Sequence, residues 1–278
     1  MKKNIKPGPE SPVGIFDSGI GGLTVADAIN RLLPAETLIY FGDTAHLPYG
    51  DKAPESIRGY SVKIADFLLS QGCKMIVIAC NTASSIAYET VKKHVGSKAL
   101  VVDVINPVVE EVVGMKKVKH VGVIGTRATI KSEAYANRIT AFNPSMKVSS
   151  LATPLLAPMI EEGFFNNKIS RTIINSYLSR PKIKKVDALI LACTHYPLIK
   201  PEIAEYYKKE ITIVDSATIV AHSVKKLLDE NDLNNSIKVK TANRHRFYIS
   251  DFTTSFEKST KIFFKGKIRL EHKNLWKP

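Results

Sequence analysis

The sequence repeats the same order of short apolar segments in its two halves. Three blocks of the first half reappear in the second at offsets of 108, 113 and 112 residues: 12–18 with 120–126, 75–82 with 188–195, and 101–103 with 213–215. One such match would carry little weight, but three in the same order at nearly the same spacing indicate two similar structural units. The chain is therefore constrained to folds that place two related halves side by side.

Short apolar runs alternate with longer amphipathic stretches along both halves. Val-, Ile- and Leu-rich runs bounded by polar or turn residues predict strands at 13–16, 37–41, 75–79, 99–102, 120–124, 147–151, 188–192 and 211–214. Helical periodicity predicts helices at 23–33, 54–71, 132–142, 168–178 and 218–231. Strands that are apolar on both faces and are separated by helices are typical of parallel sheets covered on both sides.

These patterns predict an α/β protein of two similar domains. We expect mainly parallel sheets covered by helices, a pseudo-two-fold axis between the domains, and an active site in the cleft between them. The first domain would comprise residues 1–104 plus 217–278, and the second residues 105–216.

Composition narrows the class of protein. The chain has 278 residues, 44% of them hydrophobic, which suits a folded globular protein. No run of about 18 apolar residues predicts a membrane span, and residues 1–12 lack the apolar core of a secretory signal. Three cysteines do not make a disulfide framework in a chain of this length. We therefore expect a cytoplasmic protein with free thiols and no membrane partner.

The net charge of +14 raises nucleic acid or an acidic small molecule as partners. More than half of the excess lies in residues 238–278, which contain 11 Lys and Arg against 3 Asp and Glu. A basic tail without a nucleic-acid-binding motif is weak support for such binding, so the sequence favours a solvated basic surface. A nucleic-acid-binding or regulatory protein remains the alternative from another class.

Two cysteines occupy equivalent positions in the repeat. Cys80 and Cys193 each follow the carboxyl end of a predicted core strand, where open α/β sheets bind ligands. If the halves face each other, the two thiols approach one ligand from opposite sides, and a chiral carbon between them could lose a proton to one and gain it from the other. Cysteine suits both roles, with a reference pKa of about 8.5. Cys73 precedes its strand and is expected to be structural.

Polar residues follow each of the two thiols. Asn81 and Thr82 stand at a helix start, where they and free backbone N–H groups can hold a carboxylate, although ordinary helix capping explains them equally well. Thr194 and His195 follow Cys193, and His195 could take or orient its proton.

Glycine-containing loops follow the first strand of each half. The loop at 17–22 does not fit G-x-G-x-x-G, because Thr24 stands where the third glycine is required, and the chain has no P-loop. A nucleotide cofactor is therefore not expected. Asp17 could pair with a substrate ammonium or act as a base toward a thiol, or simply form a turn. The equivalent loop in the second half supplies Thr126 and Thr129 as hydroxyl donors.

Together these segments resemble the aspartate/glutamate racemase family. The resemblance extends over roughly residues 13–266 and rests on the motifs at 14–25, 48–50, 79–84, 125–129 and 192–198, with a similar ending at 245–248 and Phe256. It implies two α/β domains that interconvert L- and D-glutamate without pyridoxal phosphate, metal or nucleotide, in the synthesis of the bacterial cell wall. It also implies a homodimer.

The resemblance assigns roles to individual residues. Cys80 would act on D-glutamate with help from Asp17, and Cys193 on L-glutamate with help from His195. Glu161 would be an additional acid near the second thiol, with Glu162 as a competing assignment. Substrate contacts would come from Asp17, Ser18, Tyr49, Gly50, Asn81, Thr82, Thr126, Thr129, Thr194 and His195. An aspartate or hydantoin racemase is the nearest alternative, since it would keep both thiols and change the pocket.

The sequence departs from the family pattern in two places. Thr153 stands where the family often has a cysteine, which leaves only the local packing open. The basic tail after Gly266 lies outside the usual pattern.

Overall fold

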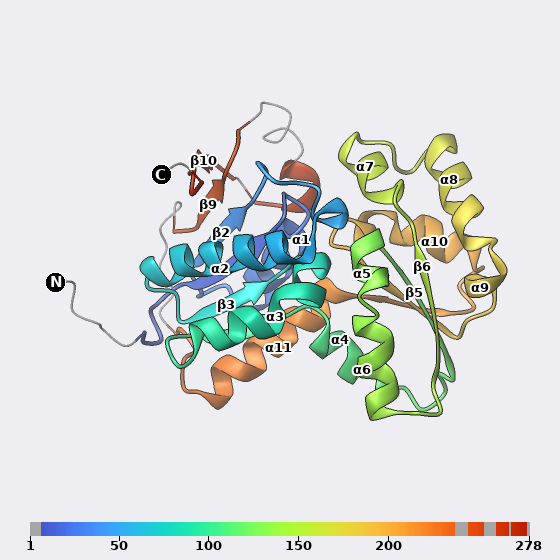
Figure 1. Ribbon diagram of the computed structural model, residues 1–278, viewed down its shortest axis with the longest axis horizontal. Helices are drawn as coiled ribbons and strands as arrows, with labels where there is room; N and C mark the ends of the chain where they lie inside the picture. Colours follow the sequence, from blue (N-terminus) through green and yellow to red (C-terminus); the bar gives the residue numbers. More distant parts are fainter. Residues whose placement is uncertain (1–6, 237–243, 253–259, 267, 277–278) are drawn as a thin grey trace.

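A computed structural model describes residues 7–236, 244–252, 260–266 and 268–276, in which the strands form two parallel sheets (Figure 1). The first sheet has the order β10-β9-β2-β1-β3-β4. Its strands are β1 (Val13–Asp17), β2 (Leu38–Gly42), β3 (Met75–Ile78), β4 (Leu100–Asp103), β9 (Arg246–Ile249) and β10 (Leu270–His272). The second sheet has the order β6-β5-β7-β8. Its strands are β5 (His120–Gly125), β6 (Lys147–Ala152), β7 (Ala188–Ala192) and β8 (Thr212–Asp215).

The two sheets repeat the same strand order, in agreement with the repeat in the sequence. In each half the first strand along the chain lies between the second and the third, and the fourth follows the third. The central strands β1, β3 and β7 are buried throughout, because helices cover both faces of their sheets. Cys80 and Cys193 therefore stand at topologically equivalent strand ends, at β3 and β7.

Helices surround the two sheets in two groups. The first sheet is covered by α1 (Leu23–Leu32), α2 (Pro54–Ser70), α3 (Asn81–Val95) and α11 (Ser216–Glu230), with α11 packed on α1 and α2 on α3 (Figure 1). The helix α4 (Asn106–Val113) joins the halves and contacts α11 and α6. The second group comprises α5 (Arg127–Lys131), α6 (Ala134–Phe142), α7 (Leu156–Glu161), α8 (Lys168–Leu178), α9 (Pro181–Lys184) and α10 (Lys200–Tyr206). Two 3₁₀ turns are η1 (Tyr49–Asp51) and η2 (Tyr196–Ile199).

The predicted α/β fold with parallel sheets is confirmed, and the eight predicted strands match β1 to β8 to within one residue at each end. The predicted helix at 132–142 is wrong at its start. Glu133 adopts a left-handed conformation with φ of 54°, so α5 ends at Lys131 and α6 begins at Ala134. Strands β9 and β10 were not predicted, because such short edge strands carry little periodicity.

We propose that the two domains meet at the predicted boundaries, between residues 104 and 105 and between residues 216 and 217. The first sheet takes its strands from 13–103 and 246–272, and the second takes them from 120–215. Phe256, part of the family-like ending, lies outside the described residues. Among the helices that the structure describes, none is long and apolar enough to cross a membrane.

Candidate active site

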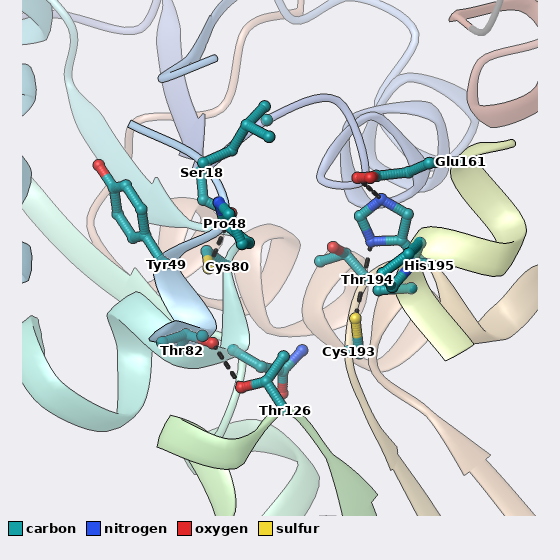
Figure 2. A pocket seen from close by; sticks show the side chains of 16 residues that line it. Ser18, Pro48, Tyr49, Cys80, Thr82, Thr126, Glu161, Cys193, Thr194 and His195 are labelled. Atoms are coloured by element: carbon teal, nitrogen blue, oxygen red, sulfur yellow. Dashed lines mark hydrogen bonds and ion pairs between the residues drawn. The ribbon is translucent and has the colours of Figure 1, made fainter. Parts of the chain in front are cut away.

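A cavity of about 250 Å³ lies where the carboxyl ends of the two sheets meet. Most residues predicted for the site line it: Ser18, Tyr49, Gly50, Cys80, Asn81, Thr82, Thr126, Glu161, Cys193, Thr194 and His195. Figure 2 shows Cys80 approaching from the first sheet and Cys193 from the second. The cavity therefore presents one thiol from each half of the molecule.

Cys80 lies between β3 and α3 and is the N-cap residue of that helix. Its Sγ accepts a hydrogen bond from the backbone N–H of Ala83 at 3.4 Å and donates one to Oγ of Ser18 at 3.6 Å. Burial raises the pKa of the Cys80 thiol to about 12, and the nearby carboxylate of Asp17 adds to the rise. The resting Cys80 is therefore a thiol, which is the form able to donate a proton.

Asp17 lies behind the cavity rather than on its wall. It is 1% exposed, and its Oδ2 accepts a hydrogen bond from the N–H of Gly19 at 3.0 Å. Burial raises the pKa of Asp17 above its ordinary value, although the charge of His195 and backbone donors oppose the rise. Among the residues that the structure describes, none forms a hydrogen bond with its Oδ1. Asp17 is close enough to Cys80 to raise the pKa of that thiol, but it does not line the cavity.

Cys193, His195 and Glu161 form a line of contacts on the opposite side. Sγ of Cys193 lies 3.6 Å from Nδ1 of His195, and Nε2 of His195 lies 2.8 Å from Oε1 of Glu161 (Figure 2). Among the described residues Nε2 has no hydrogen bond of good geometry, so its contact with Glu161 is an ion pair when the imidazole is protonated. Burial lowers the pKa of His195, but its contacts with Cys193 and Glu161 raise it well above its ordinary value. These contacts therefore favour the protonated form of the imidazole beside the second sulfur.

Of the two candidate acids, Glu161 is the one that contacts His195. Glu161 is the last residue of α7 and faces the imidazole, whereas Glu162 follows the helix, is exposed and does not line the cavity. The geometry therefore favours Glu161 as the acid beside the second thiol.

Hydroxyl groups from both halves meet at the floor of the cavity. Oγ1 of Thr82 lies 2.9 Å from Oγ1 of Thr126 and 3.2 Å from Oγ1 of Thr129, and the last two lie 3.0 Å apart. Thr129 belongs to this cluster without lining the cavity. Next to it, Asn81 accepts a hydrogen bond from Tyr135 at 2.7 Å through Oδ1, while its buried Nδ2 has no hydrogen-bond partner among the described residues. Because Asn81 lines the cavity, this amide is a candidate donor to a ligand.

The Tyr49 side chain does not offer its hydroxyl to the cavity. The hydroxyl donates a hydrogen bond to Oδ2 of Asp43 at 2.7 Å, and Figure 2 shows it directed away from the two thiols. Tyr49 therefore forms part of the wall without directing its hydroxyl to the ligand space. Gly50 also packs closely here, since a Cβ there would lie 3.1 Å from Cβ of Thr126 and would require that side chain to shift by a few tenths of an ångström.

The apolar part of the wall was missed by sequence reasoning. Leu47, Ala157 and Pro158 line the cavity, but none belongs to a motif with a chemical signature. Among the described lining residues there is no Lys or Arg, so apart from His195 an anionic ligand would be held by neutral hydroxyl, amide and backbone donors. Among the described residues, no group of three or more His, Cys, Asp and Glu side chains could hold a metal ion.

The family profile for Asp/Glu/Hydantoin racemase matches residues 13–224. The chain belongs to this family. A glutamate racemase of Chlorobium phaeobacteroides is 42% identical over 263 residues, which cover 95% of this chain and 96% of the relative. A glutamate racemase of Geobacter metallireducens is 41% identical over 260 residues, 94% of this chain and 95% of the relative.

Solved structures agree with this assignment. The crystal structure of a glutamate racemase from Francisella tularensis in complex with D-glutamate has a TM-score of 0.89 and 39% identity to this chain, covering 96% of this chain and 99% of the other. The chain is therefore an enzyme of the racemase class of isomerases, as the sequence resemblance predicted.

Proposed function

We propose that this enzyme interconverts L- and D-glutamate without a cofactor, using Cys80 and Cys193 as the two proton-transfer groups. The observation that carries the proposal is that one small cavity is lined by both thiols, one from each sheet (Figure 2). A Cα held between them would expose opposite faces to the two sulfurs. Inversion would then require only that one sulfur takes the proton as the other supplies one.

The two sides of the cavity differ in a way that suits the reaction from L-glutamate. The protonated His195 would stabilise a thiolate at Cys193, which removes the Cα proton. The Cys80 thiol would then deliver its proton to the opposite face. Turnover from D-glutamate runs the same steps in reverse, with Cys80 as the base and Asp17 as the nearby carboxylate.

The transition state places negative charge on the α-carboxylate. Donors such as the free amide of Asn81 and the hydroxyls of Thr82 and Thr194 would stabilise this charge, each contributing about 3–4 kcal/mol by the effect of removing such a donor. These donors are buried and already positioned, so little reorganisation accompanies the proton transfer.

The names of the similar proteins support glutamate as the substrate. The Chlorobium and Geobacter proteins are named glutamate racemases, and the Francisella structure holds D-glutamate. We place the reaction in the cytoplasm, where D-glutamate would supply peptidoglycan synthesis. We also propose that the enzyme is a homodimer, which sedimentation velocity would test directly.

The experiment is incubation of the enzyme with each enantiomer of glutamate in deuterium oxide without added cofactor, following optical rotation and α-deuteration. We expect racemisation with deuterium incorporation, and much slower turnover of aspartate. Cys80→Ser and Cys193→Ser should each abolish racemisation, while Cys73→Ala, at a buried cysteine away from the cavity, should retain it. Full racemase activity in either serine variant would exclude the two-thiol mechanism, and faster turnover of aspartate would exclude glutamate as the preferred substrate.

A further inference from the structure

A buried carboxylate behind the cavity wall accepts hydrogen bonds from four side chains that belong to three separate segments of the chain. Asp43 is fully buried and accepts hydrogen bonds from Nδ1 of His46 at 2.9 Å and from the Tyr49 hydroxyl at 2.7 Å. Two further donors come from the C-terminal part: Oγ of Ser250 at 2.8 Å and Nε1 of Trp276 at 3.0 Å. Asp43 thus joins the segment before η1 to β9 and the tail.

Trp276 also packs against aromatic rings on this side of the molecule. Its ring meets the edge of His46 at 4.4 Å and that of Tyr60 at 5.3 Å between centroids, and His46 stacks on Tyr60 at 4.0 Å. Nζ of Lys63 lies 5.3 Å from the centre of the indole ring. The indole is therefore held by ring contacts and a cation as well as by its hydrogen bond.

This contact connects the tail with the wall of the active site. The Tyr49 hydroxyl and the indole N–H bind the same carboxylate, and Pro48, Tyr49 and Gly50 line the cavity. The backbone N–H of Asp43 donates to the carbonyl oxygen of Asp17 at 3.0 Å, so the same residue is tied to the loop beside Cys80. Losing one donor leaves the buried carboxylate short of a partner, and the remaining groups must rearrange around it.

We propose that Trp276 is a positioning residue for the substrate-binding wall at residues 48–50, acting through Asp43 and Tyr49. The inference rests on the proposed function only in taking glutamate as the ligand of the cavity. The proposal gives a role to the basic tail beyond Gly266. This tail contains the one tryptophan of the sequence, and its indole N–H donates to Asp43 behind the cavity wall.

Trp276→Phe tests the proposal, since it keeps an aromatic ring and removes only the N–H donor. The wall would hold the substrate in the ground state and the transition state alike, so we expect KM for both enantiomers to rise about 3- to 10-fold with kcat within about twofold of the native value. Lys273→Ala, an exposed position in the same tail, is the matched control and should leave KM unchanged.

Trp276 also supplies a spectroscopic readout, because indole emission of the native enzyme comes from this residue alone. Saturating D-glutamate should change that emission if the cavity wall and the tail are coupled. A melting temperature measured for each variant separates positioning from loss of stability.

Two results would overturn the coupling: a KM for Trp276→Phe within about twofold of native, or equal losses in kcat and stability with no rise in KM. Unchanged Trp276 emission of the native enzyme at saturating D-glutamate would also contradict the coupling between the tail and the cavity wall. Failure of the native enzyme to racemise glutamate would instead reject the proposed function, whereas normal native turnover with an unaffected Trp276→Phe variant would reject the coupling alone.

Discussion

Gly21 faces the imidazole of His195 so closely that an added Cβ would lie 2.6 Å from Nδ1 and 2.5 Å from Oγ1 of Thr194. Real Cβ atoms do not approach other atoms this closely. The Thr24 hydroxyl also links these two segments. It donates hydrogen bonds to the carbonyl oxygens of Gly21 at 2.9 Å and Thr194 at 3.1 Å. The glycine loop of the first half thus sets the position of the His195 side chain in the second.

Gly21→Ala should displace His195 from Cys193. Because a misplacement of about 1 Å in an active site can reduce the rate about 100-fold, we expect kcat/KM for glutamate to fall by about that factor. Steady-state kinetics in both directions would measure it. Gly59→Ala is the control, since no atom of the described residues packs within 4 Å of its added Cβ and the residue does not line the cavity. Equal losses in the two variants would contradict a specific role for the Gly21 contact.

Glu161→Gln should weaken the reaction that uses Cys193 as the base. Removing the carboxylate charge lowers the pKa of His195 toward its ordinary value, because the ion pair with Glu161 no longer favours the charged imidazole. Losing one interaction with a charged group costs about 1.5 kcal/mol or more, which is at least about tenfold in rate. We therefore expect about tenfold slower turnover of L-glutamate near neutral pH. Glu162→Gln, at the exposed neighbour, should be unaffected; a larger effect there would reverse the assignment.

The pKa of Cys80 predicts how its reactivity depends on pH. Burial and the Asp17 charge raise this pKa to about 12 from an ordinary 9.0, so the thiolate fraction in the native enzyme should rise tenfold per pH unit up to that value. Iodoacetamide labelling between about pH 7 and 9.5, located by peptide mapping, should therefore accelerate without levelling off. In denaturant the same cysteine should level off near 9. A plateau near pH 9 in the native enzyme would contradict the raised pKa.

The same shift links the Cys80 thiol to stability. The folded chain keeps the thiol proton up to about pH 12, whereas the unfolded chain loses it near 9. The contribution of this group to stability is therefore fully present below pH 9 and is lost as the pH rises from 9 to about 12.

Lys74→Met should destabilise the enzyme without changing its chemistry. Nζ of Lys74 lies 2.7 Å from Oε2 of Glu36, with the two side chains 0% and 1% exposed. Removing one partner of a buried ion pair leaves the other charge uncompensated, which typically costs about 3–5 kcal/mol. Urea unfolding would measure the loss, with Arg58→Ala at an exposed pair as the control, expected to cost less than about 1 kcal/mol. A loss below about 1 kcal/mol for Lys74→Met would contradict the account.

The fold could be predicted because its signals are local. Apolar runs of strand length identified β1 to β8, and the repeat placed Cys80 and Cys193 at equivalent strand ends. Local signals failed where a single backbone angle decides the outcome, as at Glu133 between α5 and α6. They also failed at β9, because this strand has only four residues and forms by pairing with the edge of β2, which is far away in the sequence.

By itself, the sequence determined the α/β class, the repeated strand order and the location of the two thiols beyond the strand ends, because side-chain periodicity and strand direction follow from the chain's own geometry. Only the tertiary structure decided that Glu161 rather than Glu162 meets His195, that the Tyr49 hydroxyl turns to Asp43, and that Trp276 joins them. These contacts join residues that are far apart along the chain or depend on the direction of one side chain. Such pairings depend on how the two halves and the tail pack together, which no local pattern specifies.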